Sequence, residues 1–385
     1  MAEVSHPFIS VDDHVQEHPS VWLDRLPKSR WGDRVPHLEG NGAGGQWVVD
    51  GKPLAGIGVA TAEGLLPDRT APPRSWEDVP LAAYDPRERL KAMDGAGIGY
   101  SVLYPTVAGL AGEAFGRLED PELELACVQA YNDWLIDVWA SASPRFIPQC
   151  IVPIYPPEMA AAEIRRAVGR GHRGVVYPPL PMELRAVPHV NELEYDVIWA
   201  TCEALGVPLC LHAGSVPRLQ LAPYETLTPP VAAALDRITR PASAIFDVAN
   251  LLFSQILTRH PGLRVVFAES TLGWAPFMFE VADNQYERDH VYLDSSYPLK
   301  PSELFRRQCF FTSWYDRVDD VARYVGADHI LWSSGLPLAT TTWPDCQDFI
   351  ERCFSRASEK DTRQILWDNA AGLYGLAPSV ANRTP

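Results

Sequence analysis

The sequence lacks the features that mark membrane, secreted and nucleic-acid-binding proteins. No run of about 18 apolar residues occurs, so we expect no transmembrane helix. The N-terminal stretch MAEVSHPFISVDDH has neither the basic nor the apolar segment of a secretory signal, and we expect a cytoplasmic protein. Acidic residues outnumber basic ones, 49 to 33, which gives a net charge of −16. Such a surface repels phosphate groups, so neither nucleic acid nor an anionic membrane is an expected partner.

Disulfides and a cysteine-based metal site are not expected either. The seven cysteines are scattered, are odd in number and form no C-x-x-C pair. Buried free thiols in a reducing compartment account for this usage better than cross-links or a zinc knuckle. They are Cys127, Cys150, Cys202, Cys210, Cys309, Cys346 and Cys353.

The chain does contain an alternation of short apolar runs with helical patterns. The runs are nearly continuous, which is typical of strands buried on both faces of a parallel sheet. Eight such runs separated by helices favour an α/β fold, a (β/α)8 barrel that forms one domain over residues 1–385. The predicted strands are Phe8–Val15, Tyr100–Tyr104, Phe146–Ile154, Gly174–Tyr177, Pro208–His212, Arg264–Ala268, Cys309–Ser313 and Ile330–Ser334.

Two stretches interrupt this alternation. Residues 19–86 are rich in glycine, proline and tryptophan and form a predicted loop-rich insertion after the first strand. Loops that follow barrel strands lie on the catalytic face, so the insertion is expected to help cover a site there; a dimerisation arm is the alternative. Residues 218–242 form a second, proline-rich insertion after the fifth strand. Helix C-caps are expected at Gly206 and Gly262.

The first strand ends in two acids and a histidine, in the stretch ISVDDHVQEHP. Because side chains two apart in a strand share a side, Asp12 and His14 are predicted to face the barrel interior and Asp13 to face away. A carboxylate and an imidazole on one face make half of a divalent metal site. The alternative is a cap formed by Asp13, with His14 as an ordinary core histidine.

Two later strands also end in polar residues. His212 closes the run PLCLH and is a candidate ligand or general base, or else a core histidine bonded to a carbonyl group. Glu269 follows the run VVFA, where a buried carboxylate is costly unless it is paired or metal-bound. It is a candidate base, ligand or substrate anchor, or a structural partner of an arginine. Trp274, expected mainly to pack over the strand end, is included in the candidate substrate pocket.

The eighth strand, in contrast, ends without an ionisable residue, in the segment ILWSSGLPLATTTWP. Gly335 contributes no side chain to the barrel mouth, and Leu338 adds an apolar wall. Ser333 and Ser334 are the nearby polar groups, and backbone bonds at the strand end are the alternative to substrate contacts. We place Ser334, Gly335 and Leu338 in the candidate substrate pocket.

In this order and spacing, the four motifs resemble the amidohydrolase-related family, in the metal-dependent branch that includes aminocarboxymuconate semialdehyde decarboxylase and the resorcylate-type decarboxylases. The resemblance runs from about Phe8 to Leu376 and includes AYNDWL, GHRGVVYPP and HPGLRVVFAESTLGWAPF. It implies a distorted TIM barrel with one divalent metal, zinc or else manganese or iron, at the strand ends. The implied metal ligands are Asp12, His14 and His212, and the implied catalytic residues are His14, His212 and Glu269.

The resemblance breaks down at the eighth strand. Relatives usually carry Ser-Asp-x-Pro-His there, whereas this chain has the stretch Ser334 to Leu338, which reads SGLPL. Three protein ligands plus water still make a plausible catalytic zinc site, with Glu269 as a fourth ligand or as the base. Alternatively the metal is lost and the remaining acids and imidazoles act alone, since proton transfer by such groups can supply ~10²–10⁴-fold.

Three functions are therefore open. The first is metal-dependent hydrolysis or decarboxylation of a small aromatic or unsaturated carboxylated substrate, whose carboxylate Arg145, Arg173 or Arg218 could hold. Surface or structural pairing is the main expectation for each of these arginines. The second is a metal-free lyase, isomerase or cyclase acting on a larger, apolar pathway intermediate. The third is a non-catalytic small-molecule binder. The resemblance also suggests a homodimer.

Overall fold

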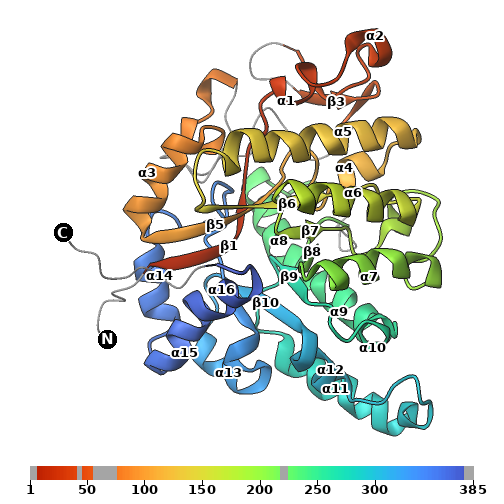
Figure 1. Cartoon of the computed structure of the whole chain (residues 1–385). Coiled ribbons are helices and arrows are strands. Elements are labelled where there is room, and N and C mark those ends of the chain that lie inside the picture. The colour runs from red at the N-terminus through yellow and green to blue at the C-terminus, as the bar shows by residue number, and fades with distance from the viewer. Residues whose placement is uncertain (1–6, 41–45, 55–75, 217–223, 377–385) are drawn as a thin grey trace.

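The computed structural model describes residues 7–40, 46–54, 76–216 and 224–376. Its main sheet has eight parallel strands, and their spatial order follows the order of the chain. Figure 1 shows these strands at the centre of the molecule with the helices around them. The strands are β1 (Phe8–His14), β5 (Ile98–Tyr104), β6 (Phe146–Ile151), β7 (Gly174–Val176), β8 (Leu209–His212), β9 (Val265–Ala268), β10 (Cys309–Ser313) and β11 (Ile330–Trp332).

Each observed strand overlaps one predicted apolar run, so the predicted TIM barrel is confirmed. The barrel closes where the chain after β11 meets β1. There the His14 N–H donates to the carbonyl oxygen of Leu336 at 2.7 Å, and the Gly335 N–H donates to that of Asp12 at 3.2 Å. The end of the eighth strand is therefore attached to the residues that the sequence singles out on the first.

Helices between the strands pack on the outside of the barrel. Two of the described helices begin where an acid followed by proline satisfies the first N–H groups: Asp85 accepts from the N–H groups of Arg87 and Glu88, and Asp120 accepts from those of Glu122 and Leu123. The longer helices are α3 (Pro86–Ala96), α5 (Pro121–Trp134), α6 (Pro157–Arg170), α7 (Asp196–Leu205), α8 (Pro229–Ala242), α9 (Ala244–Leu252), α11 (Ala275–Arg288), α12 (Pro301–Gln308), α13 (Val318–Val325) and α14 (Cys346–Cys353). The shorter ones are α1 (Ser20–Leu23), α2 (Lys28–Trp31), α4 (Glu113–Gly116), α10 (Ile256–Arg259), α15 (Glu359–Arg363) and α16 (Asn369–Leu373).

One of the two predicted glycine caps is present. Gly206 ends α7 in the left-handed conformation, with φ of 66°. Gly262 does not cap a helix, because the preceding helical pattern is broken into α9 and α10. The break comes at Gln255, which takes a left-handed φ of 64°, and α10 already ends at Arg259.

The first insertion is less loop-rich than predicted. It contains a small antiparallel sheet of β2 (His37–Glu39), β3 (Gln46–Val49) and β4 (Lys52–Pro53). Trp22 and Trp47 are fully buried and meet edge to face at 5.6 Å, and the Trp22 indole donates to the carbonyl oxygen of Cys127 in α5 at 3.1 Å. These tryptophans therefore belong to the hydrophobic core and attach the insertion to α5. Figure 1 shows α1 and β3 above α5. The second insertion is partly helical as well, since α8 occupies its C-terminal half.

One prediction from the composition, buried free thiols, is also met. All seven cysteines are free and buried. None of the helices in the described ranges combines the length and the hydropathy that a bilayer crossing requires.

Candidate active site

Four polar side chains lie together at the carboxyl ends of the barrel strands. Asp12 and His14 end β1, His212 ends β8, and Glu269 directly follows β9. All four are buried, with no more than 3% of any of them exposed. Burying charges and imidazoles costs free energy unless they have partners. The contacts of these four groups therefore indicate which ligand the site can bind.

Asp12, His14 and His212 bring three atoms close together. Nε2 of His14 lies 3.3 Å from Oδ1 of Asp12, and Nε2 of His212 lies 3.4 Å from the same oxygen. The two Nε2 atoms are 3.3 Å apart. The three atoms thus form a nearly equilateral triangle. Within the described part of the chain, this is the group of acidic, histidine and cysteine side chains with the spacing of metal ligands.

The backbone decides which nitrogen of each ring faces this triangle. Nδ1 of His14 bonds the carbonyl oxygen of Pro105 at 2.7 Å, and Nδ1 of His212 bonds that of Ala213 at 2.8 Å. A carbonyl oxygen only accepts, so both Nδ1 atoms carry hydrogen, and in neutral rings both Nε2 atoms present lone pairs. Oδ1 of Asp12 also has no hydrogen-bond donor among the described residues. Three acceptors therefore converge, an arrangement that a cation stabilises.

The pKa values of the site residues also indicate that a positive charge is stabilised at the triangle. Burial lowers the pKa of His212, but the carboxylates of Asp12 and Glu269 more than offset this and raise it to about 9. For Asp12, burial raises the pKa, but His212 and His14 hold it well below its usual range. A proton and a divalent cation would thus compete for the same place, and metal binding would release the proton.

The triangle also has the dimensions of a metal site. With edges of 3.3–3.4 Å, it forms one face of a tetrahedron. The centre of such a tetrahedron lies ~2.0 Å from each corner, which matches the Zn–N distance of ~2.0–2.1 Å. Three protein ligands leave a position for water or substrate, as in catalytic zinc sites. The residues present therefore fit a divalent cation.

Glu269 stands beside the triangle, on the Nδ1 side of His212. Its Oε2 lies 3.6 Å from that Nδ1 atom and has no hydrogen-bond partner among the described residues, while its N–H donates to Oδ2 of Asp12 at 3.0 Å. Its φ of 53° is left-handed, which costs a non-glycine residue of order 1–3 kcal/mol and is common at functional sites. Burial raises the pKa of Glu269, against the opposing charges of Arg240 and His212. This placement suits proton transfer better than metal ligation.

Asp13 faces away from the triangle, as predicted, and ties β11 to β1. Its Oδ1 accepts hydrogen bonds from the hydroxyls of Ser10 and Ser334 at 2.7 and 2.6 Å, and its Oδ2 accepts one from Ser101 at 2.5 Å. The N–H of Leu336 also donates to Oδ1, at 3.2 Å. Ser334 was predicted to line the substrate pocket, but its hydroxyl is directed to Asp13 on the far side of the strand. This network joins residues that are far apart in the sequence, so no local pattern predicts it.

Gly335 has a left-handed φ of 72°, at the point where β11 meets β1. A Cβ there would make ordinary contacts with Cα of Thr341 at 3.5 Å and with the Trp314 indole at 3.7 Å. Space therefore allows a side chain, and what disfavours one is the backbone conformation, which Asp and Asn tolerate better than most residues. Leu338 donates its N–H to the Gly335 carbonyl oxygen at 2.9 Å and is half-buried beside it.

A family model described as amidohydrolase matches residues 47–376. The chain belongs to the amidohydrolase family. A curated relative, the gamma-resorcylate decarboxylase of Polaromonas sp. (strain JS666), is 24% identical over 332 residues, which cover 82% of this chain and 96% of the relative.

Solved structures with the same fold cover nearly the whole chain. An amidohydrolase of Mycobacterium avium subsp. paratuberculosis K-10 superposes with a TM-score of 0.76 at 23% identity, over 96% of this chain and 99% of the other. A dihydroxybenzoic acid decarboxylase of Polaromonas sp. JS666, solved with manganese and the inhibitor 2-nitroresorcinol, gives 0.65 at 20% identity, over 96% and 97%.

In this amidohydrolase, two of the arginines proposed to hold a substrate carboxylate lie at the wrong end of the barrel. Arg145 precedes β6 and donates to the carbonyl oxygen of Gly99 at 2.8 Å, and Arg173 precedes β7 and donates to that of Tyr374 at 3.1 Å. Residues that precede the strands lie at the amino ends, opposite the site. Structural pairing, the main expectation for both arginines, agrees with these contacts. Arg218 lies outside the described residues.

Trp274 has structural contacts at the start of α11. Its indole N–H donates to the carbonyl oxygen of Ser270 at 2.8 Å, and its ring packs edge-on against Phe311 at 5.0 Å. Packing over the strand end, the main expectation for this residue, agrees with these contacts. Its inclusion in a substrate pocket stays a prediction.

Arg240, near the end of α8, is a residue that the sequence analysis missed. A Cβ at Gly214 would overlap Cγ and Cδ of Arg240, so the glycine, with φ of 83°, lets the arginine stem cross the chain just after His212. Ser243 fixes this approach, because its hydroxyl accepts from the Gly214 N–H at 3.2 Å and donates to the Arg240 carbonyl oxygen at 2.7 Å. No local pattern marks an arginine on a helix of an expected loop insertion.

Two other carboxylates, one buried and one half-buried, hold the loop that follows β5. Glu17 accepts from the N–H of Val107 at 2.8 Å, and Glu113 accepts from those of Leu110 and Ala111 at 2.9 and 2.7 Å. Burial raises the pKa of both, that of Glu17 to about 7. Since their oxygens are engaged by backbone donors, both have a structural role.

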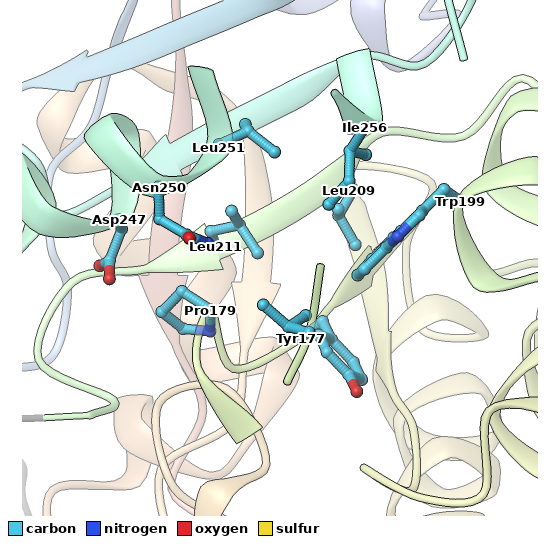
Figure 2. Close-up of a pocket in the computed structure, with 10 residues that line it drawn as sticks. Tyr177, Pro179, Trp199, Leu209, Leu211, Asp247, Asn250, Leu251 and Ile256 are labelled. Atoms are coloured by element: carbon cyan, nitrogen blue, oxygen red, sulfur yellow. The ribbon is translucent and has the colours of Figure 1, made fainter. Parts of the chain in front are cut away.

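A small apolar cavity lies outside the barrel wall and not at this site. Figure 2 shows Leu209 and Leu211 of β8 beside Trp199 of α7 and Leu251 of α9. Its volume of about 20 Å³ admits about one water molecule. Leu211 precedes His212 directly and points to the opposite side of the strand. The cavity is therefore a packing gap between the wall and the helices.

Proposed function

We propose that this amidohydrolase is a metal-dependent decarboxylase of small aromatic carboxylates. The observation that carries the proposal is the convergence of Asp12, His14 and His212, three acceptors at the carboxyl ends of the barrel strands. Relatives named for the decarboxylation of gamma-resorcylate and dihydroxybenzoic acid, one of them solved with manganese, support the reaction and the substrate class. That class is a hydroxylated ring bearing a carboxylate.

The side chains would divide the work as follows. Asp12, His14 and His212 would hold a zinc or manganese ion through Oδ1 and the two Nε2 atoms, while the carbonyl groups of Pro105 and Ala213 orient the imidazoles. When bound, the cation would polarise and orient a substrate oxygen.

Glu269 would move the proton. In decarboxylation the C–C bond to the carboxylate breaks and carbon dioxide leaves. The electron pair left on the ring carbon takes one proton, which Glu269 would supply and regain from water. In hydrolysis, the alternative reaction, the same carboxylate would instead accept a proton from water.

Turnover should depend on the metal. We expect manganese-loaded protein to convert 2,6-dihydroxybenzoate, or another hydroxybenzoate of a panel, to carbon dioxide and the ring product in equal amounts. Chelation should abolish this activity, and manganese or zinc should restore it, with products measured by chromatography and carbon dioxide by mass spectrometry. Turnover that survives complete chelation would contradict the proposal and favour the metal-free acid–base enzyme.

Two other outcomes would point elsewhere. Cleavage of aromatic esters or amides without release of carbon dioxide would indicate the hydrolase, and tight binding without any turnover would indicate the non-catalytic binder. The cytoplasmic location and the homodimer stay predictions from the sequence.

A further inference from the structure

We propose that Arg240 forms a binding site for a second carboxylate of the substrate, one that is not released in the reaction. The inference rests on the proposed function, because it places another group of the same substrate. It assigns a role to a residue outside the set of Asp12, His14, His212 and Glu269.

The position of Arg240 is set by close packing at the mouth of the barrel. Its stem crosses the backbone at Gly214, and the chain from His212 to Gly214 spans at most ~7 Å. The Ser243 hydroxyl clamps the end of α8 to Gly214. The stem of Arg240 is therefore held against the backbone two residues after His212, one of the three candidate metal ligands.

The guanidinium retains donors for a ligand. Its Nη2 pairs with Asp236, one helical turn earlier, and the side chain is 31% exposed. Because a guanidinium has five N–H donors in a planar fork, one ion pair leaves room for a bidentate carboxylate. Burial lowers the pKa of Arg240, but the carboxylates of Glu269, Asp236 and Glu113 more than offset this and raise it.

An anionic substrate needs such a cation here. The site itself contains the carboxylates of Asp12 and Glu269, which repel a negatively charged ligand. The other arginines considered are engaged elsewhere: Arg145 and Arg173 lie at the opposite end of the barrel, and Arg89, behind β1, donates to the carbonyl oxygen of His14 at 2.8 Å. Arg240, in contrast, lies against Gly214, next to the end of β8 that carries His212.

The carboxylate that Arg240 binds should be one that stays on the ring. Decarboxylation moves the negative charge of the departing group onto the ring, and carbon dioxide leaves as a neutral molecule. An arginine on that group would stabilise the ground state more than the transition state and would slow the reaction. A carboxylate that keeps its charge throughout can be bound without this penalty.

The test compares two ligands that differ only in such a carboxylate. One is 2-nitroresorcinol, and the other is 3,5-dihydroxy-4-nitrobenzoate, which is the same molecule with a carboxylate opposite the nitro group. Calorimetric titration of the manganese-loaded full chain should give a roughly 10- to 100-fold preference for the carboxylated compound, as expected for charge-assisted hydrogen bonds.

Three variants make the measurement specific. Arg240→Met keeps a stem to pack on Gly214 and should reduce the preference to near one, and Arg240→Lys should retain part of it. Arg237→Met, on the exposed face of the same helix, should leave it unchanged. Thermal melting of each variant verifies folding.

Either of two results would overturn the inference. The first is equal affinity of the wild-type protein for both ligands, which needs no variant. The second is a preference that survives in Arg240→Met, which would leave Arg240 with a purely structural role beside Glu269 and Glu113. Failure of the proposed function would be distinguishable, since it would appear as absent carbon dioxide release and not as a change in this ratio.

Discussion

Replacing His212 by asparagine should empty the metal site and abolish metal-dependent turnover. The asparagine amide can occupy the place of Nδ1 and keep the bond to the carbonyl oxygen of Ala213, but it provides no atom at the place of Nε2. Changes in residues that merely support metal ligands cost roughly 10- to 100-fold in affinity or activity, so loss of a ligand should cost at least ~100-fold.

The measurement is metal per chain by elemental mass spectrometry, together with the rate of carbon dioxide release. His172→Asn is the matched control, because His172 is also buried and bonds the carbonyl oxygen of Asn132 at 3.0 Å, outside the ligand triangle. It should keep its metal even if it melts earlier. Full metal content in His212→Asn would show that the triangle does not hold the ion.

Replacing Glu269 by glutamine should separate proton transfer from metal binding. The amide is nearly isosteric but cannot supply or accept the proton, so turnover should fall by ~10²- to 10⁴-fold. Metal content should stay at the wild-type level, because Oε2 of Glu269 lies beside Nδ1 of His212 and not within the ligand triangle.

Glu113→Gln provides the comparison, since Glu113 is a half-buried carboxylate whose oxygens are engaged by backbone N–H groups. It should lower the melting temperature and change turnover by no more than a few-fold. If Glu269→Gln loses the metal, Glu269 is a ligand. If its turnover is unchanged, the proton comes from another group.

The barrel could be predicted from local patterns, and the set of Asp12, His14 and His212 from the resemblance to the family together with such patterns. Eight apolar runs give the strands, and alternation along β1 places Asp12 and His14 on one side and Asp13 on the other. Since the carboxyl ends of parallel strands meet at one end of a barrel, His212 joins them across a long stretch of chain. The bond from the Ser334 hydroxyl to Asp13 could not be predicted, because its partner lies on a strand that is distant in the sequence.

The arginines show where sequence patterns stop being informative. Arg145 and Arg173 directly precede strands, and chain direction alone places them at the amino ends of the barrel, so their exclusion was available from the sequence. The position of Arg240 could not be predicted from the sequence, because it depends on a contact with Gly214, and no sequence pattern relates that helix to that loop. The left-handed Gly214 after His212 is the one local sign of a close approach there.

The central claim is that Asp12, His14 and His212 hold a metal although Gly335 contributes no carboxylate. Metal content of gently purified protein tests this most directly, measured for the wild-type chain, Gly335→Asp and Gly335→Asn. Asp and Asn both tolerate the left-handed backbone, and the site has room for a Cβ, so the pair differs mainly in the carboxylate. We predict close to one zinc or manganese ion per chain in all three proteins. Metal in Gly335→Asp alone would contradict the claim and would mean that the loss of this carboxylate ended metal binding.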